Sequence, residues 1–414
     1  MSDSMRGVPF ARRATVRVGM IGLGGRGLSL LGNLLNIDGV EVTAIYDPDP
    51  RKAERAQERM AATEKPVATL YSGDDGCQRL AAHDEIDLIY IASPWESHVD
   101  HAVCAMEQGK HAAVEVPAAT TLEGCWQLVE TSERTRRHCV MLENCCYGYN
   151  EMLVNRMVHD GLLGTITHAE AAYIHDLRAQ LLDDAGGAYW RRVPHRERDG
   201  NLYPTHGLGP VAWYMDIHRG DRFDFLVSVS SLERGLSEFR DTRLASTDPR
   251  RGERFRCGDM NTSIIKTVHG RTILLQHDVV TPRPYERNNM VAGTKGAFRD
   301  YPARLYLDGQ SGAEEWTTLD QFKARYEDPL WTSIGARAIR VGGHDGIDYL
   351  MNYRLMQCVQ AGLPPDIDVY DAAAWSAPGP LSEQSVAQGS LPLRFPDFMG
   401  GASLPVDMST AHRT

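Results

Sequence analysis

A glycine-rich turn near the N-terminus has the residue types and spacing to hold a phosphate group. The turn contains Gly22, Gly24, Gly25, Arg26 and Gly27. It follows the apolar run Val16–Ile21 and leads into a helical pattern. Because glycines carry no side chain, backbone N–H groups at the helix N-terminus can approach a pyrophosphate. The turn with its flanking strand and helix therefore predicts a dinucleotide site, which a bare G-x-G-x-x-G would not.

An acid follows the next apolar run and indicates which dinucleotide binds. Asp47 comes directly after Val40–Tyr46 and stands 20 residues beyond Gly27. A carboxylate there accepts hydrogen bonds from the hydroxyls of the adenosine ribose. It would also repel the 2′-phosphate of NADP. We therefore expect NAD as the cofactor.

Side chains suited to proton transfer occur in the second half of the chain. Tyr203 and His206 stand three residues apart, and glycines and prolines frame this segment. Histidine titrates near neutral pH, and a tyrosine at this spacing can reach the same site as a second acid or hydrogen-bond donor. A single histidine or tyrosine is more often structural, but the framing fixes backbone direction in a segment with little other reason to be rigid. Residues 173–178, 190–191 and 282–285 carry further unusual side chains.

The elements that position the glycine turn follow the pattern of a doubly wound parallel sheet, in an overall α/β class. We expect strands at 16–21, 40–46, 86–92, 111–115 and 139–143. Helices are expected at 27–36, 50–62, 98–108 and 122–136. Ligands bind at the carboxyl ends of such strands, so cofactor contacts are expected in 93–98, in 115–117 and at Asn144.

Beyond a helix at 150–160 the pattern changes to long β-type segments at 168–177, 223–232, 262–268, 272–280 and 290–293. These predict a second, α+β domain on a largely antiparallel sheet. A helix at 347–361 and a proline-rich tail follow. We thus expect an NAD-binding Rossmann domain at 1–148, a substrate domain at 149–376 and a tail at 377–414 that packs on the surface.

Composition limits the choice of partners. The 414 residues carry a net charge of −11, and no run of basic residues is longer than a short pair such as Arg12-Arg13, which disfavours nucleic acid and anionic membranes. No run approaches the about 18 apolar residues of a membrane span. A small molecule or glycan is the expected ligand. The first residues contain no signal-peptide pattern, although a chain whose leader had been removed would look the same.

Cysteine and histidine spacing predicts neither a disulfide framework nor a metal site. The eight cysteines show no C-x-x-C spacing, and we expect reduced, mostly buried side chains. Adjacent Cys145 and Cys146 raise the alternative of redox chemistry, yet neighbours in a strand point to opposite faces. His98 and His101 have the i, i+3 spacing of ligands on a helix, but no third ligand is evident nearby.

The motifs resemble a known family. The tripeptide at 115–117 is similar to the Glu-Lys-Pro of the Gfo/Idh/MocA oxidoreductase superfamily. A longer resemblance, over most of the chain, is to the NAD-dependent glycoside hydrolases of family 109, the α-N-acetylgalactosaminidases. The strings that carry it lie at 24–27, 94–95, 114–119, 143–148, 172–178, 201–210, 276–278, 284–285 and 371–376.

The resemblance implies a set of site residues. Cofactor contacts fall on Gly25, Arg26, Asp47, Trp95, His98, Glu115, Val116, Asn144, Arg191 and Tyr203. Sugar contacts fall on Tyr173, Tyr203, His206 and Tyr285. His206 is the expected base at the C3 hydroxyl, and Tyr203 is expected to handle the C2 proton or the departing oxygen. Which of the two takes which proton stays open. Analogy with the superfamily also implies a homodimer formed through the exposed face of the second-domain sheet.

The chain departs from the superfamily's dehydrogenases in a chemically informative way. Val116 replaces a lysine that relays protons, and Leu202 replaces the usual aspartate four residues before the histidine. The resemblance instead implies hydrolysis through transient oxidation at C3, elimination of the glycosidic oxygen and addition of water. Two alternatives remain: a net sugar dehydrogenase that releases NADH, and a non-catalytic NAD-binding sensor or scaffold.

Overall fold

The computed structural model describes residues 4–63, 65–184 and 189–400, and they form two compact units. The first unit joins Met1–Tyr149 to Pro329–Ser376, and the second joins Asn150–Asp328 to Ala377–Thr414. Both units are therefore built from two separate parts of the chain. This division differs from the predicted continuous domain at 149–376, because periodicity reveals that a helix is amphipathic but not which core its apolar face joins.

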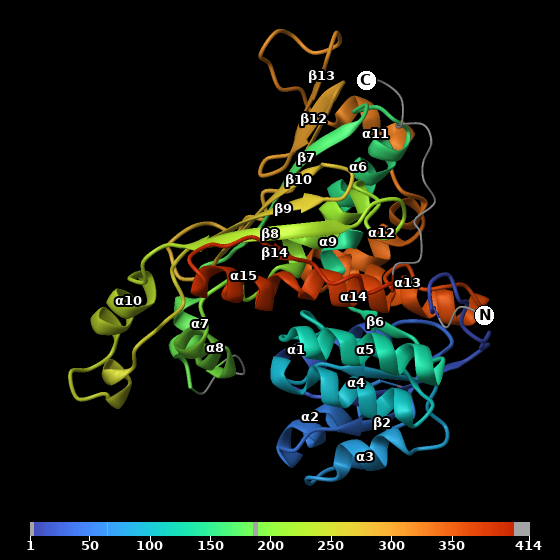
Figure 1. Ribbon diagram of the computed structural model, residues 1–414. Helices are drawn as coiled ribbons and strands as arrows, with labels where there is room; N and C mark the ends of the chain where they lie inside the picture. Colours follow the sequence, from blue (N-terminus) through green and yellow to red (C-terminus); the bar gives the residue numbers. More distant parts are fainter. Residues whose placement is uncertain (1–3, 64, 185–188, 401–414) are drawn as a thin grey trace. The chain divides into compact units, whose positions relative to one another are not determined.

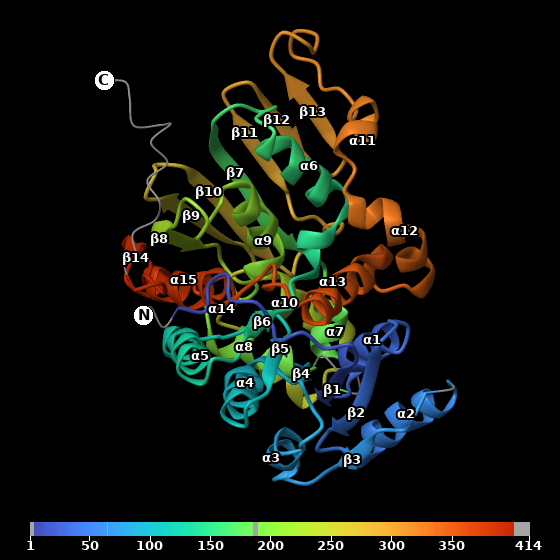
Figure 2. The same ribbon diagram turned by 90° about the vertical axis from the view of Figure 1, so that its right-hand side faces the viewer.

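The first unit, whose helices α1, α4 and α5 are labelled in Figure 1, is built on a parallel sheet with the strand order β3-β2-β1-β4-β5-β6, which can be followed by its labels in Figure 2. The strands are β1 Val16–Ile21, β2 Val40–Tyr46, β3 Thr69–Tyr71, β4 Leu88–Ile91, β5 His111–Val114 and β6 Cys139–Met141. The helices between them are α1 Gly25–Leu34, α2 Pro50–Ala61, α3 Gly76–Ala81, η1 Trp95–Ser97, α4 His98–Glu107 and α5 Leu122–Thr135. The predicted Rossmann arrangement is confirmed, although β3 and α3 were not predicted from the sequence.

The returning segment of the first unit is helical. It contains α12 Pro329–Val341, η5 His344–Gly346, α13 Ile347–Ala361 and α14 Val369–Ser376. Helix α13 packs against α1 and against η2 (Asn144–Tyr147), while α14 packs against α5 and β6. The predicted bounds of α13 are those of the structure, in which this helix belongs to the first compact unit.

The second unit is built on a mostly antiparallel sheet with the order β13-β12-β11-β7-β10-β9-β8-β14 (Figure 2). Among the described strands of this second sheet, only β7 and β10 pair in parallel. The strands are β7 Ile166–Ile174, β8 Phe223–Ser230, β9 Asn261–Thr267, β10 Thr272–Asp278, β11 Met290–Gly293, β12 Gly296–Arg299, β13 Arg304–Leu307 and β14 Leu393–Arg394. The helices are α6 Tyr149–His159, α7 Arg178–Leu182, η3 Tyr189–Arg191, α8 Arg192–Glu197, α9 Thr205–Tyr214, α10 Gly235–Arg243, η4 Pro249–Gly252, α11 Asp320–Tyr326 and α15 Pro378–Ala387.

The predicted C-terminal tail is a structured part of the second unit. Pro378 and Pro380 lie in the first turn of α15, where a missing N–H costs little, and both are buried. Helix α15 packs on β8, and β14 adds a strand beside β8. The prolines therefore mark a helix start, and the prediction of a surface brace was wrong for the described residues. Among those residues, no helix is long and apolar enough to cross a membrane.

Candidate functional site

The glycine turn leaves a cradle at the N-terminus of α1. A Cβ on Gly27 would lie 1.9 Å from the carbonyl oxygen of Gly22, so the first turn of the helix packs directly on the end of β1. A Cβ on Gly24 or Gly25 would meet no described atom within 4 Å. No side chain caps the helix, which leaves its first N–H groups for a ligand. This open, uncapped turn fits the pyrophosphate of a dinucleotide.

Asp47 ties the end of β2 to this turn. Its Oδ2 accepts a hydrogen bond from the backbone N–H of Leu23 at 2.8 Å, and its Oδ1 accepts one from Asp49 at 2.9 Å. The side chain is buried, with the ammonium of Lys52 3.8 Å from Oδ1. Since a carboxylate can accept about four hydrogen bonds, capacity remains for two ribose hydroxyls. The residue fits the role that the sequence predicts for it.

Trp95 and His98 join the loops that follow β4 and β5. The indole of Trp95 donates to the carbonyl of Val116 at 3.1 Å. The ring nitrogens of His98 lie 2.8 Å from the carbonyls of Pro117 and Ser93, and burial lowers the pKa of this imidazole. Both nitrogens are thus occupied by backbone. A cofactor contact by His98 would involve a ring edge, and it stays a prediction.

A network of charged groups surrounds Asp348. Arg26 donates through Nε to Glu115 at 2.7 Å and through a terminal nitrogen to Asp348 at 2.6 Å. Asn144 donates to the other oxygen of Asp348 at 2.6 Å, and His344 Nδ1 lies 2.8 Å from Oδ2. Burial alone would lower the pKa of the Arg26 guanidinium, but the two carboxylates raise it above its ordinary value. Arg26 therefore stays charged and fixed at the glycine turn.

Burial alone would raise the pKa of the Asp348 carboxyl. The hydrogen bond from His344 and the charge of Arg26 outweigh that effect and hold the pKa well below its ordinary value. The same hydrogen bond raises the pKa of His344. Sequence analysis missed both residues. The signal was present in the glycine-flanked run 342–346 directly before α13, which resembles no ordinary helix start.

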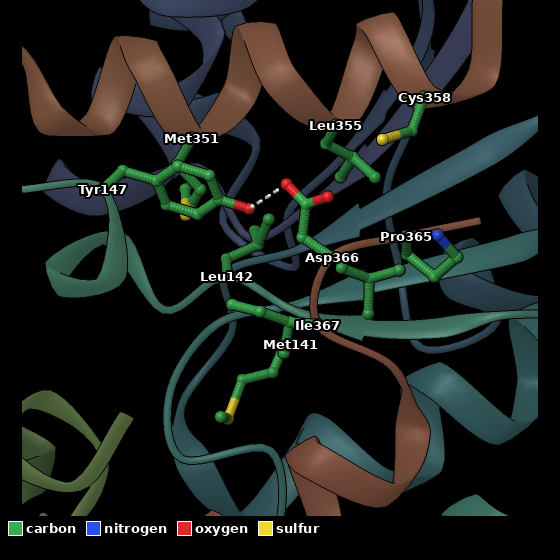
Figure 3. A pocket seen from close by; sticks show the side chains of 10 residues that line it. Met141, Leu142, Tyr147, Met351, Leu355, Cys358, Pro365, Asp366 and Ile367 are labelled. Atoms are coloured by element: carbon green, nitrogen blue, oxygen red, sulfur yellow. Dashed lines mark hydrogen bonds between the residues drawn. The ribbon is translucent and has the colours of Figure 1, made fainter. Parts of the chain in front are cut away.

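The short helix η2, which carries Asn144, is also anchored to α13. Figure 3 shows the hydroxyl of Tyr147 pointing toward the carboxylate of Asp366, at 3.3 Å. Arg354 of α13 binds both oxygens of Asp366 at 2.8 Å, and Trp331 donates to the carbonyl of Tyr147 at 3.0 Å. A cavity of about 10 Å³ beside them has room for about one water molecule. Asn144 therefore sits on a rigid support.

The second unit gathers tyrosines and histidines into one cluster, which we call the Tyr–His cluster. Its members are Tyr173, His175, Tyr203, His206 and Tyr285. The hydroxyl of Tyr203 lies 3.3 Å from Nε2 of His206, and that of Tyr173 lies 3.0 Å from Nδ1 of His175. The two tyrosine rings are 4.6 Å apart. Two tyrosine–histidine pairs therefore stand side by side, and each can hold or pass a proton.

Two further histidines and an arginine border the Tyr–His cluster. His277 stacks near Tyr173 with ring centroids 6.4 Å apart, and His195 stacks near His277 at 6.3 Å. Burial lowers the pKa of His277 to about 3 and that of His195 to about 4, with the charge of Arg191 adding to both effects. Arg191 lies over the Tyr203 ring at 5.4 Å. Sequence analysis did not assign His195 or His277 a role, and a lone buried histidine gives no signal in one sequence.

The structure brings the predicted residues together in two groups. Those of the first unit lie at the carboxyl ends of β1, β2, β4, β5 and β6, as expected for a doubly wound sheet. They are Gly22, Gly24, Gly25, Arg26, Gly27, Asp47, Trp95, His98, Glu115, Val116 and Asn144. The others, Tyr173, Arg191, Tyr203, His206 and Tyr285, belong to the second unit. Their individual roles stay predictions.

Comparison with known proteins identifies first the class and then the family. Residues 16–143 match the family described as Oxidoreductase family, NAD-binding Rossmann fold, so the first unit is an NAD-binding oxidoreductase fold. Residues 147–404 match Glycosyl hydrolase 109, C-terminal domain. The chain belongs to glycosyl hydrolase family 109, and it is an enzyme whose cofactor is NAD. The predicted family and cofactor are confirmed.

Curated relatives share this arrangement over nearly their whole length. A glycosyl hydrolase family 109 protein of Solibacter usitatus is 54% identical over 403 residues, which cover 97% of this chain and 92% of that protein. Family members from Saccharopolyspora erythraea and Shewanella amazonensis are 48% and 47% identical, covering 96% of this chain and 86% and 89% of theirs. The whole described fold is thus that of the family.

Solved structures support the fold alone. The scyllo-inositol dehydrogenase of Lactobacillus casei, with bound NAD(H) and scyllo-inositol, has a TM-score of 0.64 at 14% identity, covering 92% of this chain and 99% of that chain. The WlbA dehydrogenase of Bordetella pertussis, in complex with NADH and UDP-GlcNAcA, has a TM-score of 0.65 at 14% identity with the same coverage.

Proposed function

We propose that this enzyme removes terminal α-linked N-acetylgalactosamine by transient oxidation of the sugar at C3. The observation that carries the proposal is the Tyr–His cluster, in which the Tyr203–His206 and Tyr173–His175 pairs stand side by side. Most glycosidases use two opposed carboxylates, whereas the members of this cluster are phenols and imidazoles. Such groups suit proton removal from a hydroxyl and from carbon more than stabilisation of an oxocarbenium ion.

The proposed reaction is an elimination followed by an addition. NAD⁺, which the glycine turn and Asp47 of the first unit would hold, would supply the acceptor and donor of hydride for C3 of the sugar. A carbonyl at C3 makes the C2 proton acidic, and loss of that proton forms the C1–C2 double bond as the C1–O bond breaks. The departing oxygen takes up a proton. Water then adds at C1, a proton returns to C2, and reduction at C3 releases the sugar.

The residues of the second unit supply the proton transfers. His206 accepts the proton of the C3 hydroxyl through an imidazole whose Nε2 is 3.3 Å from the Tyr203 hydroxyl. Tyr203 handles the C2 proton or the departing oxygen, and Tyr173 and Tyr285 contact the sugar. Val116 supports the assignment of the proton transfers to the second unit. It stands where the superfamily's dehydrogenases carry a proton-relaying lysine, and a valine cannot transfer a proton.

The alternative is a net sugar dehydrogenase, and one experiment separates the two. Purified protein is incubated with NAD⁺ and p-nitrophenyl glycosides of several sugars, and nitrophenol and NADH absorbance are followed together. We expect nitrophenol in large excess over NADH, with p-nitrophenyl α-N-acetylgalactosaminide cleaved fastest. In D₂O the released sugar should carry deuterium at C2. Stoichiometric NADH without nitrophenol would show that the protein is a net dehydrogenase. Absence of deuterium at C2 of the released sugar would exclude the elimination.

We also propose a homodimer formed through the outer face of the second unit's sheet. Val229 and Ile264 are 54% and 47% exposed there, and Leu274 pairs with Ile264 across the sheet. Exposed apolar side chains on neighbouring strands favour association. Light scattering should give twice the chain mass for wild-type protein and the monomer mass for Ile264→Asp. A monomeric wild type would contradict the proposal.

A further inference from the structure

The charged network of the first unit converges on Asp348, a residue without a role in the proposed reaction. Asp348 is fully buried near the start of α13, and it accepts hydrogen bonds from Arg26 of the glycine turn and from Asn144 of η2. Arg26 and Asn144 stand 322 and 204 residues before Asp348 in the chain. One buried carboxylate thus joins two predicted cofactor contacts.

Asp348 also determines which way the Asn144 amide faces. A carboxylate is an acceptor only, so the NH₂ group of Asn144 must be the one that faces it, at 2.6 Å. The carbonyl oxygen of Asn144 is thereby directed away from Asp348, with the thiol of Cys145 3.5 Å from it, and it keeps the capacity to accept a further hydrogen bond from a ligand. Asn144 is itself buried, and η2 is anchored to α13 through Tyr147 and Asp366. The amide therefore has one stable orientation as long as residue 348 carries a carboxylate.

His344 is a third hydrogen-bond partner of the Asp348 carboxylate, and a strained turn positions it. All five residues from Gly342 to Gly346 have positive φ, including His344 at 46° and Asp345 at 56°. Side chains rarely tolerate that region, so such strain persists only where the surrounding structure enforces it. A Cβ on Gly343 would lie 2.7 Å from Oδ2 of Asp348. The turn brings the His344 imidazole onto the same oxygen that binds Arg26.

We propose that Asp348 and His344 are positioning residues for NAD, because they fix the Arg26 guanidinium and the Asn144 amide in the arrangement that the cofactor requires. Neither residue touches the reacting atoms in this role. The inference rests on the proposed function only for the placement of Arg26 and Asn144 at the cofactor. It predicts that NAD affinity depends on a helix at the far end of the chain.

The first test measures the dissociation constant of NAD⁺ by calorimetry on cofactor-stripped protein. Asp348→Asn keeps the shape but loses the charge, and its new NH₂ allows the Asn144 amide to flip. Losing hydrogen bonds to a charged group should weaken NAD⁺ binding about 10- to 100-fold. Asp221→Asn is the matched control, since Asp221 is also fully buried and paired with an arginine, Arg271. Binding by folded Asp348→Asn within twofold of wild type overturns the proposal.

His344→Gln keeps the proposal testable if Asp348→Asn does not fold, because the His344 side chain is 66% exposed. Its imidazole faces Asp348, Arg26 and Glu115, and Arg340 of α12 lines the groove beside Gly343. The charges of Arg26, Glu115 and Asp348 sum to −1 with neutral His344 and to 0 with protonated His344. An anionic pyrophosphate should bind better when His344 is protonated, because the four side chains then carry no net charge. Wild-type NAD⁺ affinity should therefore fall about threefold from pH 6 to pH 8.5, and His344→Gln should abolish this dependence. An unchanged pH profile overturns the role of His344.

A double-mutant cycle shows whether Asp348 acts through Arg26. Arg26→Gln and Asp348→Asn should each weaken NAD⁺ binding, and the double variant should be clearly less impaired than the product of the two effects. Multiplicative effects would mean that Asp348 does not work through Arg26. A wild type that binds NAD⁺ without cleaving glycosides, with Asp348→Asn binding it more weakly, contradicts the proposed function and supports this inference.

Discussion

The two clusters of functional side chains differ in charge. In the first unit, Arg26 forms ion pairs with Glu115 at 2.7 Å and with Asp348 at 2.6 Å. In the second unit, the Tyr–His cluster consists of phenols and imidazoles, and it is bordered by His277 and His195, whose pKa values are lowered by burial. Paired charges resist any change of protonation, whereas neutral phenols and imidazoles can exchange protons. The first arrangement suits binding of a cofactor, and the second suits chemistry on a substrate.

The largest effect should come from removing the base of the Tyr–His cluster. His206→Ala should lower turnover by about 10²–10⁴-fold, the usual contribution of general acid–base catalysis. Affinity for NAD⁺ should be unchanged, because the ribose and pyrophosphate contacts belong to the first unit. Steady-state kinetics at saturating NAD⁺ measure this, with His269→Ala on an exposed hairpin turn as the control. Near wild-type turnover would remove His206 from the mechanism and move the base to Tyr203 or Glu115.

The matching change in the first unit should affect affinity instead. Asp47→Ala should weaken NAD⁺ binding about 10- to 100-fold, since a charged acceptor of ribose hydroxyls and of the Leu23 N–H is lost. Turnover at saturating NAD⁺ should fall much less. Asp49→Ala, which removes the cap of α2 and the ion pair with Arg51, serves as the control in the same titration. Unaltered affinity in Asp47→Ala would contradict the cofactor assignment of this carboxylate.

Acid should destabilise the second unit through its buried histidines. The pKa of His277 is lowered to about 3 in the folded protein, from about 6.5 in the unfolded chain. The neutral form thus stabilises the fold fully above pH 6.5, and this stability is lost as the pH falls from 6.5 toward 3. Between pH 7 and pH 5 the loss is about 2 kcal/mol. Thermal melts should show a smaller shift between these pH values in His277→Gln. An equal shift in both proteins would mean that His277 is not held neutral.

The smallest effect should come from the rim of the Tyr–His cluster. Tyr285 is 42% exposed, and its ring contacts Tyr173 and His175 edge-on. Tyr285→Phe keeps these ring contacts and removes one hydroxyl, which should raise KM for the glycoside about 2- to 10-fold with little change in kcat. A large fall in kcat would instead place this hydroxyl in the chemical step.

The sequence predicts the parts of this molecule whose evidence is local. The bounds of β1, β2 and α13 follow from apolar runs and helical periodicity, and Asp47 follows from its distance to the glycine turn. The carboxyl ends of the parallel strands then indicate where Glu115 and Asn144 lie. These positions depend on neighbours in the chain or on a rule of sheet topology, both of which one sequence contains.

Features that depend on long-range packing could not be predicted. Asp348 matters because Arg26 and Asn144 reach it from distant segments, and the glycine-flanked run 342–346 beside it marks an unusual helix start without revealing these partners. The buried pair His195 and His277 is likewise assembled from separate elements. Pro378 and Pro380 were misread because a proline favours a loop and a helix start equally well until burial is known.

The divided first unit has a consequence for synthesis of the protein. Helices α13 and α14 cover α1, α5 and β6, yet α13 begins at Ile347 and is translated 347 − 149 = 198 residues after Tyr149. At a synthesis rate of about 5–20 residues per second, the surfaces of α1, α5 and β6 that these helices cover stay exposed for roughly 10 to 40 seconds. The nascent Rossmann half is therefore exposed to aggregation during that interval, and a chain truncated before α12 would lack both the cover of its core and the carboxylate that holds Arg26.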